Sequence, residues 1–181
     1  MAKAREIPGI DQDLPYAIAA ARVVAVRAQE VVEHSQGVLD VGDIERVHDM
    51  RVATRRLRAA LEVFRPCFPE DEFKATLREV KAIADALGER RDRDVTIAAL
   101  EDFGGALATP DRPGIESLVA KLRSEQSEAN ANLAGFVDQA RLTALRVRLE
   151  SLVAAAERTG AEAQPHAGGS ANGGDPVEAG R

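Results

Sequence analysis

Apolar residues recur every three or four positions along most of the chain, which is the spacing of an amphipathic α-helix. The clearest stripe lies between Asp13 and His34 and consists of Leu14, Ile18, Ala21, Val24, Ala28 and Val31. Pro15 suits the first turn of such a helix, and Gly37 suits the position that follows its end. The pattern therefore predicts a first helix over residues 13–34.

The same spacing, together with residues that begin or end helices, predicts further helices over residues 43–65, 70–87, about 89–103, 115–133 and 137–158. Asp43 is a suitable N-cap for the first of these, and Pro66 ends it. Gly88 is predicted to separate the next two, and residues 104–114, rich in Gly and Pro, are predicted to form a loop. We expect an all-α protein, an antiparallel bundle of about six helices.

The composition agrees with close-packed helices, because the chain of 181 residues contains no Trp, one Tyr and five Phe. One domain is expected over residues 13–158, with a flexible N-terminus at residues 1–12. Residues 159–181 are expected to be a disordered tail, since their Gly, Ala, Pro and polar residues cannot offset the entropy of ordering. The polar stretch 124–132 in the fifth helix predicts either fraying or a face toward a partner.

The charge and the apolar content limit the function. The formal net charge is −6, so any anion binding has to come from local clusters of Arg and Lys. No stretch approaches the roughly 18 apolar residues of a membrane span, and the N-terminus lacks the apolar core of a signal peptide. A cytoplasmic protein without membrane contact is therefore expected. The single cysteine, Cys67, excludes an intramolecular disulfide.

Basic residues form a stripe on the second predicted helix. At about 100° per residue, the stripe lies beside the apolar face and not opposite it, and it contains His48, Arg51, Arg55, Arg58 and Arg65. Arg56 lies about a quarter turn or more away from it. Like charges three and four positions apart repel one another, so something outside the helix is expected to offset the repulsion. His48 can add charge when an anion binds, because its unperturbed pKa lies near neutral pH.

The third predicted helix repeats this layout, with Lys74, Arg78 and Lys81 beside its apolar face. If the two helices pack side by side at about 8–10 Å, both basic rows can line one groove and reach one extended anion. Arg offers fork-shaped donors to phosphate oxygens, and Lys offers a compact charge. The alternative is that the rows are solvated faces, balanced by acids such as Glu62 and Asp85.

Two segments resemble the CHAD domain family (conserved histidine α-helical domain). Residues 47–61, Val-His-Asp-Met-Arg-Val-Ala-Thr-Arg-Arg-Leu-Arg-Ala-Ala-Leu, resemble its signature helix. Residues 77–88, followed by Arg-Asp-Arg-Asp-Val at 91–95, resemble its next basic helix and its Arg-Asp-x-Asp-Val segment, in the same order. Two ordered motifs are more specific than either alone, and the resemblance covers roughly residues 13–155.

The resemblance implies a helical fold, usually of two related four-helix halves, whose basic surface binds inorganic polyphosphate and which often accompanies triphosphate-tunnel enzymes. The implied contacts are His48, Arg51, Arg55 and Arg58, with Lys81 and Arg91 from the second motif. Asp92 and Asp94 are expected to orient arginines or cap a helix. Nothing after Gly105 repeats the His/Arg-rich helix, so the chain resembles one half plus connecting helices, and a homodimer would restore two basic helices.

We therefore expect a non-catalytic module, without a cofactor or metal, that binds polyphosphate for targeting to granules or for presentation to an enzyme. The predicted binding set is His48, Arg51, Arg55, Arg58, Lys74, Arg78, Lys81 and Arg91, with Arg56 and Arg65 as weaker members. Nucleic acid is disfavoured, because single strands call for aromatic stacking and duplexes for a basic protein.

Two alternative functions remain. The first is a helical protein-interaction module with solvated basic faces. The second is a Mg²⁺-dependent phosphoanhydride hydrolase that uses Asp85, Glu89, Asp92 or Asp94. Against the hydrolase, the acids around position 90 alternate with arginines. The sequence also contains no phosphate-binding glycine loop, zinc motif or nucleophile elbow.

Overall fold

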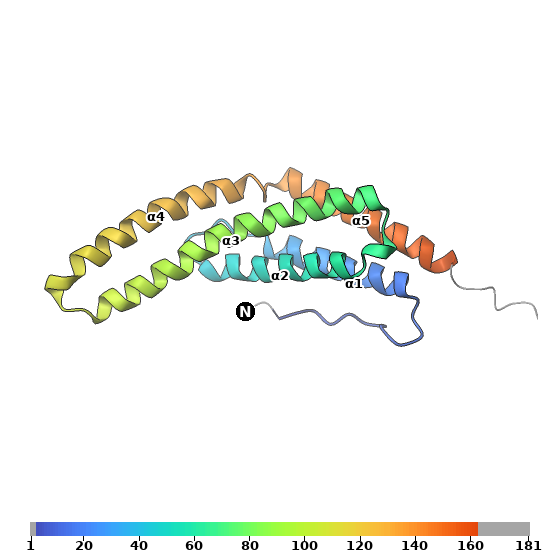
Figure 1. Ribbon diagram of the computed structural model, residues 1–181, viewed down its shortest axis with the longest axis horizontal. Coiled ribbons are helices and arrows are strands. Elements are labelled where there is room, and N and C mark those ends of the chain that lie inside the picture. Colours follow the sequence, from blue (N-terminus) through green and yellow to red (C-terminus); the bar gives the residue numbers. More distant parts are fainter. Residues whose placement is uncertain (1–2, 163–181) are drawn as a thin grey trace, which may run out of the picture.

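The computed structural model describes residues 3–162, and within this range it is built from helices without a strand (Figure 1). The α-helices are α1 (Tyr16–His34), α2 (Ile44–Val63), α3 (Glu70–Ala106), α4 (Arg112–Ala134) and α5 (Gln139–Glu162). Two short 3-10 helices, η1 (Arg65–Cys67) and η2 (Thr109–Asp111), lie in the connections. The predicted all-α class is confirmed. Of the tail expected at residues 159–181, residues 163–181 lie outside the described range.

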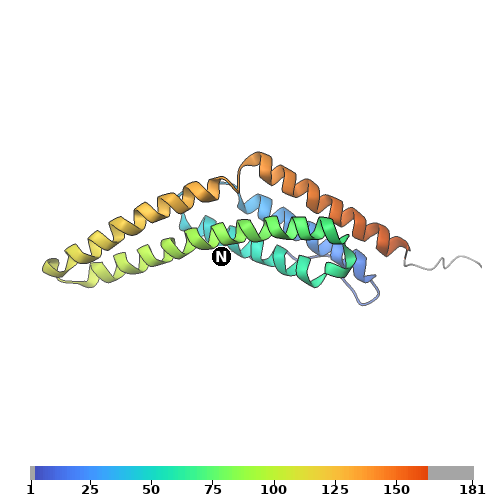
Figure 2. The ribbon, with the colours of Figure 1, turned by 45° about the horizontal axis from the view of Figure 1, so that its top comes forward.

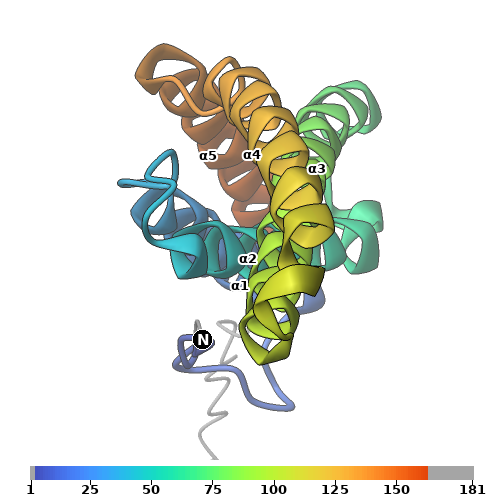
Figure 3. The same ribbon diagram turned by 90° about the vertical axis from the view of Figure 1, so that its left-hand side faces the viewer.

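The molecule consists of a four-helix body and a two-helix arm. Helices α1, α2 and α5 and the first half of α3 share one apolar core, whereas the second half of α3 continues past the body and pairs with α4 (Figures 1 and 2). Around the body α1 lies between α5 and α2, and α2 lies between α1 and α3 (Figure 3). The edge formed by α2 and α3 is therefore opposite the edge formed by α1 and α5.

The apolar stripes predicted from the sequence build this core. Val24 of α1, Met50 and Leu57 of α2, Leu87 of α3 and Leu152 of α5 are completely buried. Burial of one such side chain contributes about 1.5–3 kcal/mol relative to exposure. None of the helices in residues 3–162 has a run of apolar residues sufficient to cross a membrane. Cys67 is buried, which raises the pKa of its thiol.

The predicted break at Gly88 is wrong, because α3 runs through it without interruption. Among the described glycines only Gly9 and Gly37 have a positive φ, so Gly88 does not form a left-handed helix end. A glycine inside a helix costs about 0.5–1 kcal/mol relative to Ala. Burial of Leu87 and Arg90 on either side of it offsets this cost. The predicted loop at 104–114 is also too long, since α3 ends at Ala106 and α4 begins at Arg112.

A buried polar network joins the arm to the body and explains the polar stretch in α4. Arg90 Nε donates to Asp94 Oδ1 at 2.8 Å, and both side chains are fully buried. From α4, Gln126 donates to the same carboxylate oxygen, while Asn130 accepts from Arg90 and donates to the carbonyl oxygen of Leu39 at 3.0 Å. Gln126 and Asn130 of the polar stretch therefore face α3, α4 is continuous through this stretch, and Asp94 orients an arginine as expected.

The described part of the N-terminal segment contacts α1. The backbone N–H of Arg5 donates to Glu30 Oε1 at 2.7 Å, and Arg27 donates to both oxygens of this buried carboxylate at 2.9 Å. Burial alone would raise the pKa of Glu30. The hydrogen bonds from Arg5 and Arg27, with the charges of Arg27 and Arg56, outweigh burial and lower the pKa below its ordinary 4.5.

This contact makes stability depend on pH. Because the folded-state pKa of Glu30 is lowered, its charged form stabilises the fold above about pH 4.5, and this contribution is lost as the pH falls through the folded pKa. We expect the melting temperature of the wild type to fall between neutral and acidic pH by several degrees more than that of Glu30→Gln. Thermal unfolding by circular dichroism at both pH values measures the difference. Equal losses in both proteins would show that Glu30 contributes nothing to the dependence.

Candidate functional site

Helices α2 and α3 lie side by side and antiparallel. Glu62 near the end of α2 contacts Lys81 in the first part of α3, and Glu45 at the start of α2 contacts Arg91 further along α3. We call the surface between these two contacts the cationic face. Its residues are His48, Arg51, Arg55 and Arg58 of α2 with Lys81 and Arg91 of α3.

Cations from the two helices meet at one carboxylate. Glu62 Oε1 lies 3.0 Å from Arg58 Nε and 3.5 Å from Lys81 Nζ. All three side chains remain about two-fifths exposed. The hydrogen bond from Arg58, the charge of Arg58 and the contact with Lys81 lower the pKa of Glu62, although its partial burial acts in the opposite direction. An anion bound where the Glu62 carboxylate lies would therefore be within reach of basic side chains from both helices.

The other end of the cationic face is tied more tightly. Arg91 Nη1 donates to the carbonyl oxygen of Ile44 at 2.9 Å, and Arg91 Nη2 lies 3.4 Å from Glu45 Oε1. Its side chain is only 17% exposed. Arg91 thus fastens α3 to the first turn of α2 and has fewer donors left for a ligand than the other arginines of the face.

The middle of the face carries arginines whose donors are unused by the protein. Arg51 is half-buried and Arg55 is exposed. Neither guanidinium has a hydrogen bond or ion pair with any residue in the range 3–162. A guanidinium carries five N–H donors and no acceptor. These two side chains are therefore the most available anion-binding groups on the cationic face.

The remaining basic residues of the predicted set lie at or beyond the margins. Lys74 Nζ and Arg65 Nη2 lie 2.7 Å and 3.6 Å from Glu70 Oε1, and the pKa of this exposed carboxyl group is lowered chiefly by the hydrogen bond from Lys74. Arg78 is exposed and lies about 60° further from α2 than Lys81 around the axis of α3. Arg56 faces α1, where its charge acts on Glu30.

One group on this side of the molecule has the residue types of a metal site. Ligand atoms of Glu45, His48 and Asp49 all lie within 4.8 Å of one another. Arg91 already contacts Glu45, and a fixed positive charge there opposes the binding of a second cation. The half-buried His48 sits between these acids and Arg51, where the cationic face begins.

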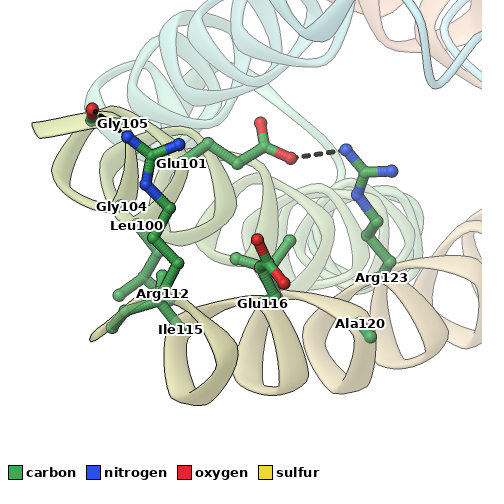
Figure 4. A pocket seen from close by; sticks show the side chains of 10 residues that line it. Leu100, Glu101, Gly104, Gly105, Arg112, Ile115, Glu116, Ala120 and Arg123 are labelled. Atoms are coloured by element: carbon green, nitrogen blue, oxygen red, sulfur yellow. Dashed lines mark hydrogen bonds and ion pairs between the residues drawn. The ribbon is translucent and has the colours of Figure 1, made fainter. Parts of the chain in front are cut away.

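None of the four cavities described in residues 3–162 is lined by a residue of the cationic face. The cavity of about 390 Å³ at the end of the arm (Figure 4) is lined mainly by apolar atoms. Its arginines are engaged, because Arg123 pairs with Glu101 and Arg112 donates to the carbonyl oxygen of Leu107 at 2.9 Å.

The groove of about 550 Å³ between α1 and α5 is the largest of these four. Its lining includes Glu33, Glu150 and Glu157 but one basic residue, Arg146, which lies 3.6 Å from Glu150. An anion would be repelled there. None of these four cavities brings together as many basic side chains as the cationic face.

The basic row on α2 was predictable from the sequence, whereas the contacts of Glu45 and Glu62 on α2 with basic residues of α3 were not. The contact between Glu70 and Lys74 has i,i+4 spacing, which a search for helical ion pairs would have found. The contact of Glu45 with Arg91 joins residues far apart in the sequence, so periodicity cannot reveal it.

Comparison with known protein families identifies one family whose model matches most of the chain. The family model for the CHAD domain matches residues 22–174. This range contains the whole cationic face. No curated protein matches the chain.

Proposed function

The chain belongs to the CHAD domain family, and on that premise we propose that it binds inorganic polyphosphate along the cationic face of α2 and α3. The family is associated with polyphosphate binding in general. The observation that carries the proposal is the approach of Arg58 and Lys81, from different helices, to a single carboxylate oxygen. This convergence supports the proposal, because it brings basic side chains of both helices within reach of one anionic group.

The shape and chemistry of the face suit a linear polymer of phosphates. His48 and Arg58 are ten residues apart on α2, which corresponds to about 15 Å along the helix, so several phosphate units can lie against one row. Arg51 and Arg55 offer guanidinium forks to phosphate oxygens, and Lys81 offers a compact charge.

The proposed role is binding without catalysis. Of the acids considered for a Mg²⁺ site, Asp94 is committed to the buried pair with Arg90, which leaves Asp85, Glu89 and Asp92 as separate exposed side chains. The module would target the protein to polyphosphate granules in the cytoplasm, or present the polymer to a partner such as a triphosphate-tunnel enzyme. A homodimer would place a second cationic face beside the first.

A protein-interaction role is the second candidate, and the arm favours it. Val95, Phe103 and Leu118 are 43–55% exposed there. A two-helix arm cannot bury all its apolar side chains by itself. This role concerns another part of the molecule and is compatible with polyphosphate binding on the body.

Titration with polyphosphate at two salt concentrations tests the main proposal. If about four phosphates contact basic side chains, the logarithm of the binding constant should fall with the logarithm of salt with a slope near −3, which is roughly a 50-fold loss between 50 and 200 mM salt. Fluorescence anisotropy of labelled polyphosphate measures the binding constant at each salt concentration. Binding that is absent at low salt, or independent of salt, would contradict the proposal. Release of phosphate on addition of Mg²⁺ would favour the hydrolase instead.

A further inference from the structure

Glu62 occupies a distinctive position on the cationic face. It is an acid in a basic row, and the same oxygen, Oε1, contacts Arg58 of its own helix and Lys81 of the neighbouring helix. A carboxylate oxygen and a phosphate oxygen make the same charge-assisted hydrogen bonds to guanidinium and ammonium groups. The side chain of Glu62 thus stands where one phosphate of a bound polymer would be held by both helices.

We propose that Glu62 is a built-in competitor of polyphosphate, whose carboxylate holds Arg58 and Lys81 until a phosphate displaces it. This inference rests on the proposed function of the cationic face. In this role, Glu62 lowers the affinity of the cationic face for polyphosphate at the end where α2 and α3 converge.

The energetics and position of Glu62 permit displacement. Its side chain is 43% exposed, and exposed ion pairs contribute about 0–1 kcal/mol, so the contacts are easily exchanged. Glu62 precedes the last residue of α2, Val63. Its carboxylate can turn into solvent by rotation of the side chain alone, while the helix remains unchanged.

The distribution of acids along the face makes the competition local. Arg51 and Arg55 have no acidic partner among the described residues, so a short anion can bind them without breaking an ion pair. A longer polymer that also reaches Arg58 and Lys81 has to displace Glu62. At the opposite end, Glu45 also contacts a cation, but Arg91 is held there by the carbonyl oxygen of Ile44 as well. Displacement of Glu45 would therefore free fewer N–H donors of Arg91 for a phosphate.

Glu62→Gln tests the inference, with Glu116→Gln as the matched control. Glu116 is exposed and lies at the end of the arm (Figure 4), so both variants remove one negative charge and only one does so on the cationic face. We expect Glu62→Gln to bind long-chain polyphosphate about 3- to 10-fold more tightly than the wild type at low salt, with a steeper salt slope. The gain should be smaller for tripolyphosphate. Glu116→Gln should differ from the wild type by less than about twofold.

The outcomes separate this inference from the proposed function. If the wild type binds polyphosphate and Glu62→Gln binds no better than Glu116→Gln, the competitor role is overturned while the binding function stands. If only Glu62→Gln binds measurably, the competitor role is supported in its strongest form. If neither protein binds, both proposals fail. Glu62→Ala, with its melting temperature measured alongside, should reproduce the gain, because loss of the charge and not the amide group is responsible.

Discussion

Replacement of Arg51 and Arg55 by alanine in one variant is expected to weaken polyphosphate binding by roughly 30- to 100-fold at low salt, or about 2–3 kcal/mol. Hydrogen bonds from these guanidiniums to phosphates would be charge-assisted, and the described residues offer them no competing acid. For the same reason, the substitution breaks no ion pair within the protein. The melting temperature should stay close to that of the wild type.

A control variant with the same change in charge separates the effect of these two arginines from an effect of net charge. Arg146 and Arg158 of α5 are exposed and lie on the helix that, with α1, forms the opposite edge of the body. The double variant Arg146→Ala/Arg158→Ala should weaken binding by less than about threefold. The salt slope should fall by about two units for Arg51→Ala/Arg55→Ala and stay unchanged for the control. Equal losses would mean that the polymer responds to net charge and not to the cationic face.

Asp94→Ala is expected to produce the largest loss of stability, about 3–5 kcal/mol, because it leaves the guanidinium of Arg90 buried without its counter-charge. Both side chains are completely buried, and Arg90 Nη2 and Asp94 Oδ2 already lack a hydrogen-bond partner in the described structure. For a domain of this size, the loss corresponds to a decrease of roughly 6–20 °C in melting temperature. Urea titration followed by circular dichroism gives the free energy of unfolding.

Two further variants show whether the charge is the cause. Asp92 lies two residues away and is exposed, so Asp92→Ala should cost less than about 0.5 kcal/mol. The double variant Asp94→Ala/Arg90→Met removes both charges and should recover much of the loss, because a buried ion pair replaced by apolar groups is often nearly neutral. A loss in Asp94→Ala no greater than that in Asp92→Ala would contradict the assigned role of the pair.

The fold was largely predictable because periodic apolar residues determine which side of each helix is buried. The stripe in α1 and the stripe in α2 both appear in the core. The continuity of α3 was not predictable, because Gly88 has the local signature of a helix end and only tertiary packing overrides it. The buried pair of Arg90 and Asp94 was also missed as a structural unit, since its partners Gln126 and Asn130 come from a distant helix.

The candidate site was predictable along each helix but not across them. Spacing placed Arg51, Arg55 and Arg58 on one stripe of α2, and helical geometry explains why Arg56 faces α1 instead. The contact of Glu62 with Lys81 depends on how α2 and α3 pack. The engagement of Arg91 by a backbone carbonyl also depends on this packing. The periodicity of residues along one helix cannot reveal contacts that a side chain makes with another helix.

The most direct test of the central claim is to follow the arginine side-chain Nε–H signals by NMR while polyphosphate is added. We expect the signals of Arg51 and Arg55 on α2 and of Arg91 on α3 to shift together, with one dissociation constant, while those of Arg146 and Arg158 stay in place. Shifts confined to one of the two helices, or centred on α5 or the arm, would contradict a shared binding face on α2 and α3.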